Sequence, residues 1–318
     1  MTSQFIDPRE GPTKSKATPC PRTTTEPGLL AELHPLCREN RIYDVERWIA
    51  AEHPLQMAAG SDRKGQTTSA LEIALDVRNQ ALVLLLLCNG YDPNMERWSP
   101  LDRVLKNRRW DLLDLLLEWG AYPRRISVGD LLDTYNSKLF GRFRDLGVDL
   151  TACHEIAAAL GYHTSNKPLF GWVKHNRDDP KIQKELDIAL AHHAREENEK
   201  GVKLCLWAGA NPHAVVPDLR YPNLSDDEDD TRSDGEDRFL GWSAIQEASQ
   251  AGHAKIVERL GPDPAKDNFD GLYRFVGSAA VVELLLAQAR PGNVGEILQH
   301  QLWWLSSFSS SRGFDIVQ

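Results

Sequence analysis

The chain has 318 residues, of which 41% are hydrophobic and 26% charged, and its formal net charge is −9. This balance is typical of a soluble globular protein, and the acidic net charge argues against a nucleic-acid partner. Five scattered cysteines without metal-ligand spacing, and no apolar run near the roughly 18 residues of a membrane span, predict a cytoplasmic protein with no membrane segment.

Residues 1–28 are rich in Pro, Thr and Ser and lack the apolar core of a signal peptide. They are therefore predicted to form a disordered N-terminal tail.

A repeating pattern begins after this tail and runs through residues 29–213. In each repeat, one apolar residue is followed by another 12 positions later, and in four repeats a glycine comes seven positions after that. The pairs are Leu33/Val45, Leu71/Val83, Leu101/Leu113, Val128/Phe140 and Leu190/Val202, and the glycines are Gly90, Gly120, Gly147 and Gly209. Such regular spacing predicts an internal repeat of about 30 residues.

Each repeat is predicted to contain two short helices and a turn. Ser69, Ser99 and Ser243 are suited to cap the first helix, whereas the glycine after the second helix is suited to a left-handed C-cap. A helix pair of this size cannot bury its apolar faces alone, so neighbouring pairs are expected to stack.

Two gaps in the pattern predict hidden repeats. The 62 residues from Val128 to Leu190 leave room for a degenerate pair at Ala157/Leu169. The 60 residues from Ile245 to Leu305 leave room for another at Asp270/Val282.

Residues 214–239 are predicted to be a disordered acidic insertion. Eight of the thirteen residues from Ser225 to Asp237 are acidic, and such a segment cannot bury enough apolar surface to order itself. Two alternatives remain open. Ser225, Thr231 and Ser233 each precede an acidic residue by three positions and could be phosphorylated, or the acidic segment could dock on a basic surface of the same chain as an autoinhibitory lid.

The repeats resume over residues 240–318, with pairs Ile245/Val257 and Leu305/Val317. The last repeat is incomplete, because the sequence ends shortly after Ile316 without a closing Leu-Leu-Gly. Either the sequence is a fragment of a longer protein or it has an unusually short C-terminal cap.

No group of residues predicts catalysis or metal binding. His192 and His193 point in different directions on one helix, and the neighbours Cys153 and His154 cannot readily form a nucleophile–base pair. Cys205 is expected in the core. We therefore expect a protein that is not an enzyme and has no cofactor or metal.

The residues Ser99-Pro100-Leu101, Leu115-Leu116-Leu117 and Gly120-Ala121-Tyr122-Pro123 resemble the ankyrin repeat, as do Ser243-Ala244-Ile245 and Ala251-Gly252-His253. The resemblance implies an all-α ankyrin-repeat solenoid of stacked helix pairs, about nine in number. The sequence departs from the family at the histidine of its TPLH motif, where it has Glu72, Asp102 or Gln246, and only Leu33-His34 keeps it. This departure puts the hydrogen bonds between repeats in doubt.

The resemblance also implies a function, because ankyrin arrays bind partner proteins on their concave side. The chain is thus expected to be a monomeric scaffold, adaptor or regulatory subunit for another protein. The residues that this register places on the concave side are Arg97, Trp98, Arg103, Lys106, Tyr122, Arg124 and Arg125. Alternatively, these charges only solvate a helix face and Trp98 packs between repeats, or the chain is the ankyrin portion of a larger enzyme or channel.

Overall fold

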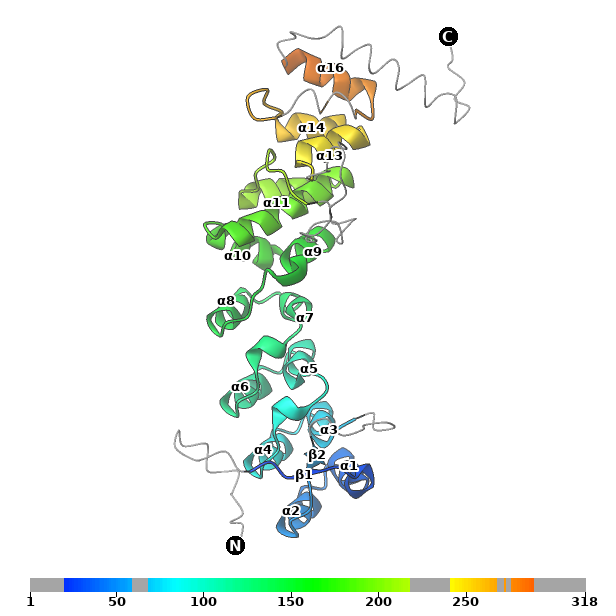
Figure 1. Ribbon diagram of the computed structural model, residues 1–318, viewed down its shortest axis with the longest axis vertical. Helices are drawn as coiled ribbons and strands as arrows, with labels where there is room; N and C mark the ends of the chain where they lie inside the picture. Colours follow the sequence, from blue (N-terminus) through cyan, green and yellow to red (C-terminus); the bar gives the residue numbers. More distant parts are fainter. Residues whose placement is uncertain (1–19, 59–67, 218–240, 268–271, 273–275, 289–318) are drawn as a thin grey trace, which may run out of the picture. The chain divides into compact units, whose positions relative to one another are not determined.

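The computed structural model describes residues 20–58, 68–217, 241–267, 272 and 276–288 (Figure 1). These residues form fifteen α-helices, four short 3-10 helices and two short strands, so the predicted all-α character is confirmed. They fall into two compact bodies, an N-terminal body within residues 1–150 and a C-terminal body within residues 151–318. Most of the predicted acidic insertion and the expected last repeat, Leu305/Val317, lie outside the described residues.

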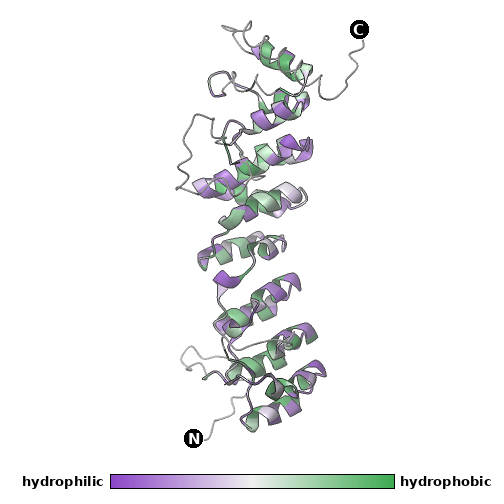
Figure 2. Cartoon of the chain, turned by 45° about the vertical axis from the view of Figure 1, so that its right-hand side comes forward, coloured by the Kyte–Doolittle hydropathy of each residue, from purple (hydrophilic) through white to green (hydrophobic). Residues whose placement is uncertain are grey.

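The N-terminal body is built from four consecutive helix pairs (Figure 1). The two helices of each pair contact each other, and the first helices α1, α3, α5 and α7 also contact one another in sequence. Figure 2 shows that the helices carry both hydrophobic and hydrophilic sides, as expected for short helices packed on their neighbours. The pairs are α1 (Leu33–Arg38) with α2 (Ile42–Ala50), α3 (Ala70–Val77) with α4 (Gln80–Cys88), α5 (Pro100–Lys106) with α6 (Trp110–Glu118), and α7 (Val128–Leu132) with α8 (Ser137–Asp145).

The C-terminal body contains three further helix pairs and a single helix. They are α9 (Glu155–Tyr162) with α10 (Lys167–Asn176), α11 (Pro180–Arg195) with α12 (Glu199–Ala208), α13 (Ala244–Ala251) with α14 (Ala254–Leu260), and α16 (Ala279–Gln288). Helix α11 has 16 residues and contacts α9, α12 and α13. Only residues 177–179 link α10 to α11, so this connection has no glycine turn. None of the described helices is long and apolar enough to cross a membrane.

The 12-residue spacing correctly identifies core positions. The described members of the predicted pairs are buried, including the hidden pair Ala157/Leu169, with two exceptions that are half-buried. These are Val128, on the five-residue helix α7, and Val282, next to the fully buried Val281. Asp270 lies outside the described residues.

Most predicted helix caps are present. Ser69 and Ser243 form capping boxes with Glu72 and Gln246, so these two side chains close the first turn of their helices. Ser99 occupies the N-cap position of α5 as predicted, but its side chain makes no capping hydrogen bond. The four predicted glycines all have left-handed backbones, with φ from 82° to 100°.

The end of the predicted disordered tail, residues 1–28, is ordered in the structure. Thr23–Thr24 (β1) pair in parallel with Gln56–Met57 (β2), and residues 27–30 form a 3-10 helix. The Arg22 amide also donates to the Gly90 carbonyl, while its guanidinium donates to the Ile49 carbonyl at 2.7 Å. This segment could not be predicted from the sequence, because two-residue strands are too short to show a hydrophobic periodicity.

Removal of residues 1–25 should therefore destabilise the N-terminal body. We expect the free energy of unfolding to fall by about 2 kcal/mol relative to a chain lacking only residues 1–19, because several backbone hydrogen bonds are lost. Urea denaturation followed by circular dichroism measures the difference. Equal midpoints for the two truncations would contradict the anchoring role of this segment.

The C-terminal body holds a buried histidine that must stay neutral. His193 is fully buried on α11, and its Nε2 donates to the Leu160 carbonyl at 3.1 Å. Gly201 makes room for the ring, since a Cβ there would lie 2.3 Å from Cγ of His193. Burial lowers the pKa of His193 to about 4.

This lowered pKa predicts a loss of stability in mild acid. Above pH 6.5 the imidazole is neutral in both states, but as the pH falls from 6.5 towards 4 it gains a proton first in the unfolded chain. At about 1.4 kcal/mol per pKa unit, the C-terminal body should lose about 3 kcal/mol over this window. Thermal melts from pH 7 to pH 4 should show a smaller loss for His193→Gln, which keeps a donor for Leu160. The matched control is the exposed His175→Gln, and an equal loss in all three proteins would disprove the assignment.

Candidate binding surface

The surface predicted from the sequence lies on two turns and one helix of the N-terminal body. Arg97 and Trp98 are in the loop between the 3-10 helix Pro93–Met95 (η2) and α5. Tyr122, Arg124 and Arg125 are at the 3-10 helix Pro123–Arg125 (η3), whereas Arg103 and Lys106 are on α5. We call these seven residues the Trp98 surface.

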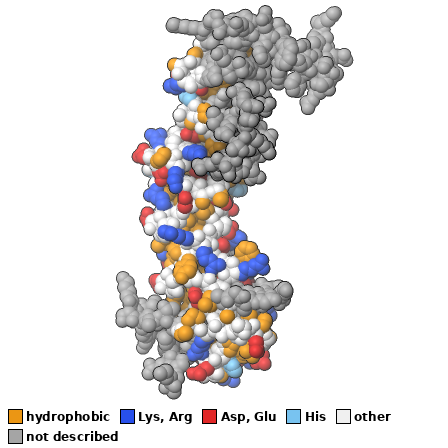
Figure 3. All heavy atoms as spheres, viewed as in Figure 1, with side chains coloured by type: hydrophobic (Ala, Val, Ile, Leu, Met, Phe, Trp, Pro, Cys, Tyr) orange, Lys and Arg blue, Asp and Glu red, His pale blue; other side chains and the backbone are white. Residues whose placement is uncertain are grey.

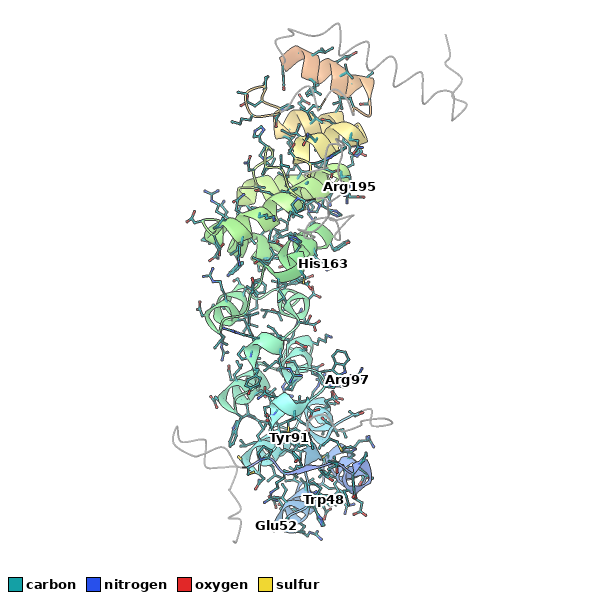
Figure 4. The ribbon with its side chains drawn as sticks, in the orientation of Figure 1. Trp48, Glu52, Tyr91, Arg97, His163 and Arg195 are labelled. Atoms are coloured by element: carbon teal, nitrogen blue, oxygen red, sulfur yellow. The ribbon has the colours of Figure 1, made fainter. Side chains whose placement is uncertain are left out.

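Trp98 does not pack between helix pairs. It is 65% exposed, and the neighbouring Tyr122 turn is also open, with Tyr122 60% exposed. The Arg97 guanidinium lies 5.3 Å from the centroid of the Trp98 ring, a cation–π distance. Figure 4 places Arg97 on the side of the first helices α3 and α5, away from α4 and α6. The alternative in which Trp98 is part of the core is therefore wrong.

Arg125 holds the two turns together. Its guanidinium donates to the backbone carbonyls of Asn94 and Glu96, the latter at 2.8 Å, and reaches the Arg97 carbonyl at 3.5 Å. Its side chain is thus committed to the preceding turn, so we assign it a positioning role rather than direct contact with a partner.

Asn94, which was not predicted from the sequence, joins the same two turns: its side chain reaches forward from the first turn to the second. Its side-chain nitrogen donates to the Gly120 carbonyl at 2.9 Å, and its side-chain oxygen accepts from the Tyr122 amide at 2.7 Å. Asn94 is four residues after Gly90, and an amide side chain can donate and accept at once. Together with Arg125 it fixes the position of the Tyr122 turn relative to Trp98.

A buried hydrogen bond also holds the loop that carries Trp98. The hydroxyl of Tyr91 donates to the carboxylate of Glu96, and both residues are buried. Burial and the Glu96 charge raise the pKa of Tyr91, so the phenol stays protonated as the donor.

Arg103 and Lys106 are engaged in ion pairs between first helices. Arg103 makes a bidentate contact with Asp76 on α3, at 2.5 and 2.7 Å, and Lys106 lies 3.1 Å from Asp130 on α7. Because such exposed pairs stabilise by only about 0.2–1 kcal/mol, a partner can reorganise them at little cost.

Asp102 occupies the position that Glu72 and Gln246 hold in other helix pairs, but it makes a different contact. Its carboxylate accepts from the Ser127 amide at 2.7 Å, so it joins α5 to the start of α7. Burial raises its pKa above the usual value for aspartate. The doubt about hydrogen bonding between repeats is therefore answered at this place by a carboxylate instead of an imidazole.

Arg124 lies over the next glycine turn. A Cβ on Gly147 would sit 2.8 Å from its guanidinium nitrogen, so this side chain rests directly on the Gly147 backbone. The guanidinium forms no ion pair or hydrogen bond in the part of the chain that the structure describes. Arg97 and Arg124 thus remain as cations without a carboxylate.

Sequence reasoning missed the exposed aromatic residues of the second helices and helix ends, among them Tyr43, Tyr162 and Trp207. Trp207 is 54% exposed, and the Lys174 ammonium lies 4.0 Å from its ring centroid. A signal for Trp207 existed, because it precedes Gly209 by two residues. In earlier repeats this register position holds the exposed Glu118 and Asp145 and the buried Cys88, so the signal was weak.

The other residues weighed for chemistry have structural surroundings. His154 binds the buried Glu185 through Nδ1 at 2.6 Å, and Glu185 also accepts the Ala157 amide. Cys205 is fully buried as expected, and burial raises its pKa. No group of three or more His, Cys, Asp or Glu residues that could hold a metal ion occurs among the described residues.

No protein-family model matches the chain, and no curated protein matches it at a significant level.

Loss of Arg125 should destabilise the two turns that carry the Trp98 surface. We expect Arg125→Ala to lower the free energy of unfolding by about 1–2 kcal/mol, because carbonyls of the preceding turn lose their charged donor. Chemical denaturation measures the change. Arg97→Ala is the matched control, since its guanidinium contacts only an exposed ring, and it should cost under about 0.5 kcal/mol. Similar losses in both variants would contradict the distinct role of Arg125.

Proposed function

We propose that this chain is an ankyrin-repeat solenoid of about nine helix pairs that binds another protein as an adaptor or regulatory subunit. Support comes from the recurring helix pairs within each body, their contacts from one first helix to the next, and the left-handed glycines that end the second helices. The capping boxes at Ser69 and Ser243 agree with this assignment.

The single observation that carries the binding proposal is the exposure of Trp98. A tryptophan that is 65% exposed leaves a large apolar ring in water, and tryptophan and arginine are the residues most enriched at the energetic centres of interfaces. Arg97 over the ring adds a charged, planar group beside it. Figure 3 shows Lys and Arg side chains beside exposed hydrophobic ones on the visible face of the N-terminal body.

The rigidity of the surface supports the same proposal. Asn94, Arg125 and the Tyr91–Glu96 pair already fix the turns that carry Trp98 and Tyr122. A partner that binds here loses little free energy to ordering of these loops, so more of the contact energy contributes to affinity.

We further propose that the protein acts in the cytoplasm as a monomer, without a cofactor and without catalysing a reaction. All five cysteines are free thiols, which suits a reducing compartment. Burial raises the pKa of Cys37 to about 12, and raises that of Cys205 as well, so neither thiol has the reactivity of a nucleophile.

Affinity purification from cells that naturally express the protein tests this function. Trp98→Ala should reduce capture of the specific partner at least about tenfold, in line with a loss of about 1.4 kcal/mol or more at an interface centre. Trp207→Ala is the matched control, because it removes another largely exposed tryptophan, one that lies on a second helix. Unchanged capture by Trp98→Ala, or an equal loss in both variants, would place the binding site elsewhere.

A further inference from the structure

The carboxylates around Trp98 are already occupied. Glu96 is buried and accepts from Tyr91, and Asp92 accepts from the amide of Asn94 at 2.8 Å. Asp102 is half-buried and accepts from the Ser127 amide, while Asp130 lies next to Lys106. Each of these acidic groups therefore has a donor or a cation in the same region.

The arginines around Trp98, in contrast, are not all paired with a carboxylate. Arg97 is exposed and only stacks on the indole, and Arg124 is exposed and rests on Gly147. Arg125 is exposed too, but its guanidinium donates to the carbonyls of the preceding turn and its charge interacts with the Asp102 carboxylate, so it is not counted with them. Two guanidinium groups on adjacent turns, those of Arg97 and Arg124, thus lie near an exposed tryptophan and have no carboxylate partner in the described part of the chain.

From this imbalance we infer that the partner presents an extended segment rich in Asp and Glu to the Trp98 surface. Planar guanidinium groups bind carboxylates in bidentate geometry, and an aliphatic or aromatic side chain of the same segment would cover the indole. The inference rests on the proposed function and specifies the chemistry of its partner.

A nucleic acid would supply anionic groups too, but the charges favour a protein segment. The chain has a formal net charge of −9, which repels a long polyanion. Two unpaired cations beside one tryptophan match a short acidic segment, whereas nucleic-acid sites carry a broad basic patch.

Fluorescence anisotropy with a labelled synthetic peptide tests the inference. The probe is a 12-residue peptide of alternating Glu and Asp with one central Leu, and its matched control has Gln and Asn in place of the acids. The same titrations are made with a chain in which a Gly-Ser linker replaces residues 218–240, so that the eight acidic residues between Ser225 and Asp237 cannot compete.

We expect the acidic peptide to bind at least tenfold more tightly than the neutral one, and its affinity to fall as salt is raised. Arg97→Gln and Arg124→Gln should each weaken binding about threefold to tenfold. Arg142→Gln, which removes an exposed arginine on α8 paired with Asp114, should leave binding unchanged.

Three results would overturn the inference. They are equal binding of the two peptides, no effect of Arg97→Gln and Arg124→Gln, and binding of single-stranded RNA that is tighter than the acidic peptide and lost in the same variants. If partner capture still depends on Trp98 in any of these cases, the proposed function stands and only the partner's chemistry is wrong. If capture is independent of Trp98, the proposed binding site is wrong as well, and the partner binds elsewhere on the chain.

Discussion

Within each of the two bodies, hydrogen bonds and ion pairs fix the position of one short helix pair relative to the next. Helices of five to ten residues are too short to be stable alone in water, so each must borrow stability from its neighbours. Apolar stacking supplies most of this, but it leaves the polar turns at the end of each pair to be fixed. Many of the bonds that fix them join residues 24 to 31 positions apart, about one repeat along the chain.

Different side chains make this turn-to-turn link at equivalent positions. Four residues after the turn glycine, Asn94 bonds to the Gly120 turn, and His213 lies 3.0 Å from the Asp267 carboxylate. The last pair is 54 residues apart because residues 217–241 lie between the bridged Val216 and Trp242. The link therefore survives a long insertion, since the backbone bridge brings the chain back to the same register. Where α10 runs almost directly into α11, Gln183 and Asp187 on the long helix take over and bind the backbone of the Gly209 turn.

These links also explain how far the sequence could predict the structure. The 12-residue pairs and the glycines were predictable, because burial and left-handed geometry each demand particular residue types at fixed spacing. The length of α11, the strand at Thr23–Thr24 and the bonds of Arg125 were not, because each depends on which backbone groups another part of the chain brings near. The sequence correctly placed Trp98 on an exposed turn. It could not distinguish Arg97 from Arg125, since both are arginines on neighbouring turns and only their acceptors differ.

On the candidate binding surface, too, some side chains bond within the fold and others are left exposed. Once Arg125 and Asn94 have fixed the turns and α5 has paired Arg103 and Lys106 with acids of its neighbours, most polar groups there serve the fold. What remains for a partner is the small set without an internal acceptor: the Trp98 ring, Tyr122 and the guanidinium groups of Arg97 and Arg124. A repeat protein can change such residues freely, because no helix pair depends on them for its stacking. Specificity can therefore reside in a few exposed side chains while the bonds between turns keep them in place.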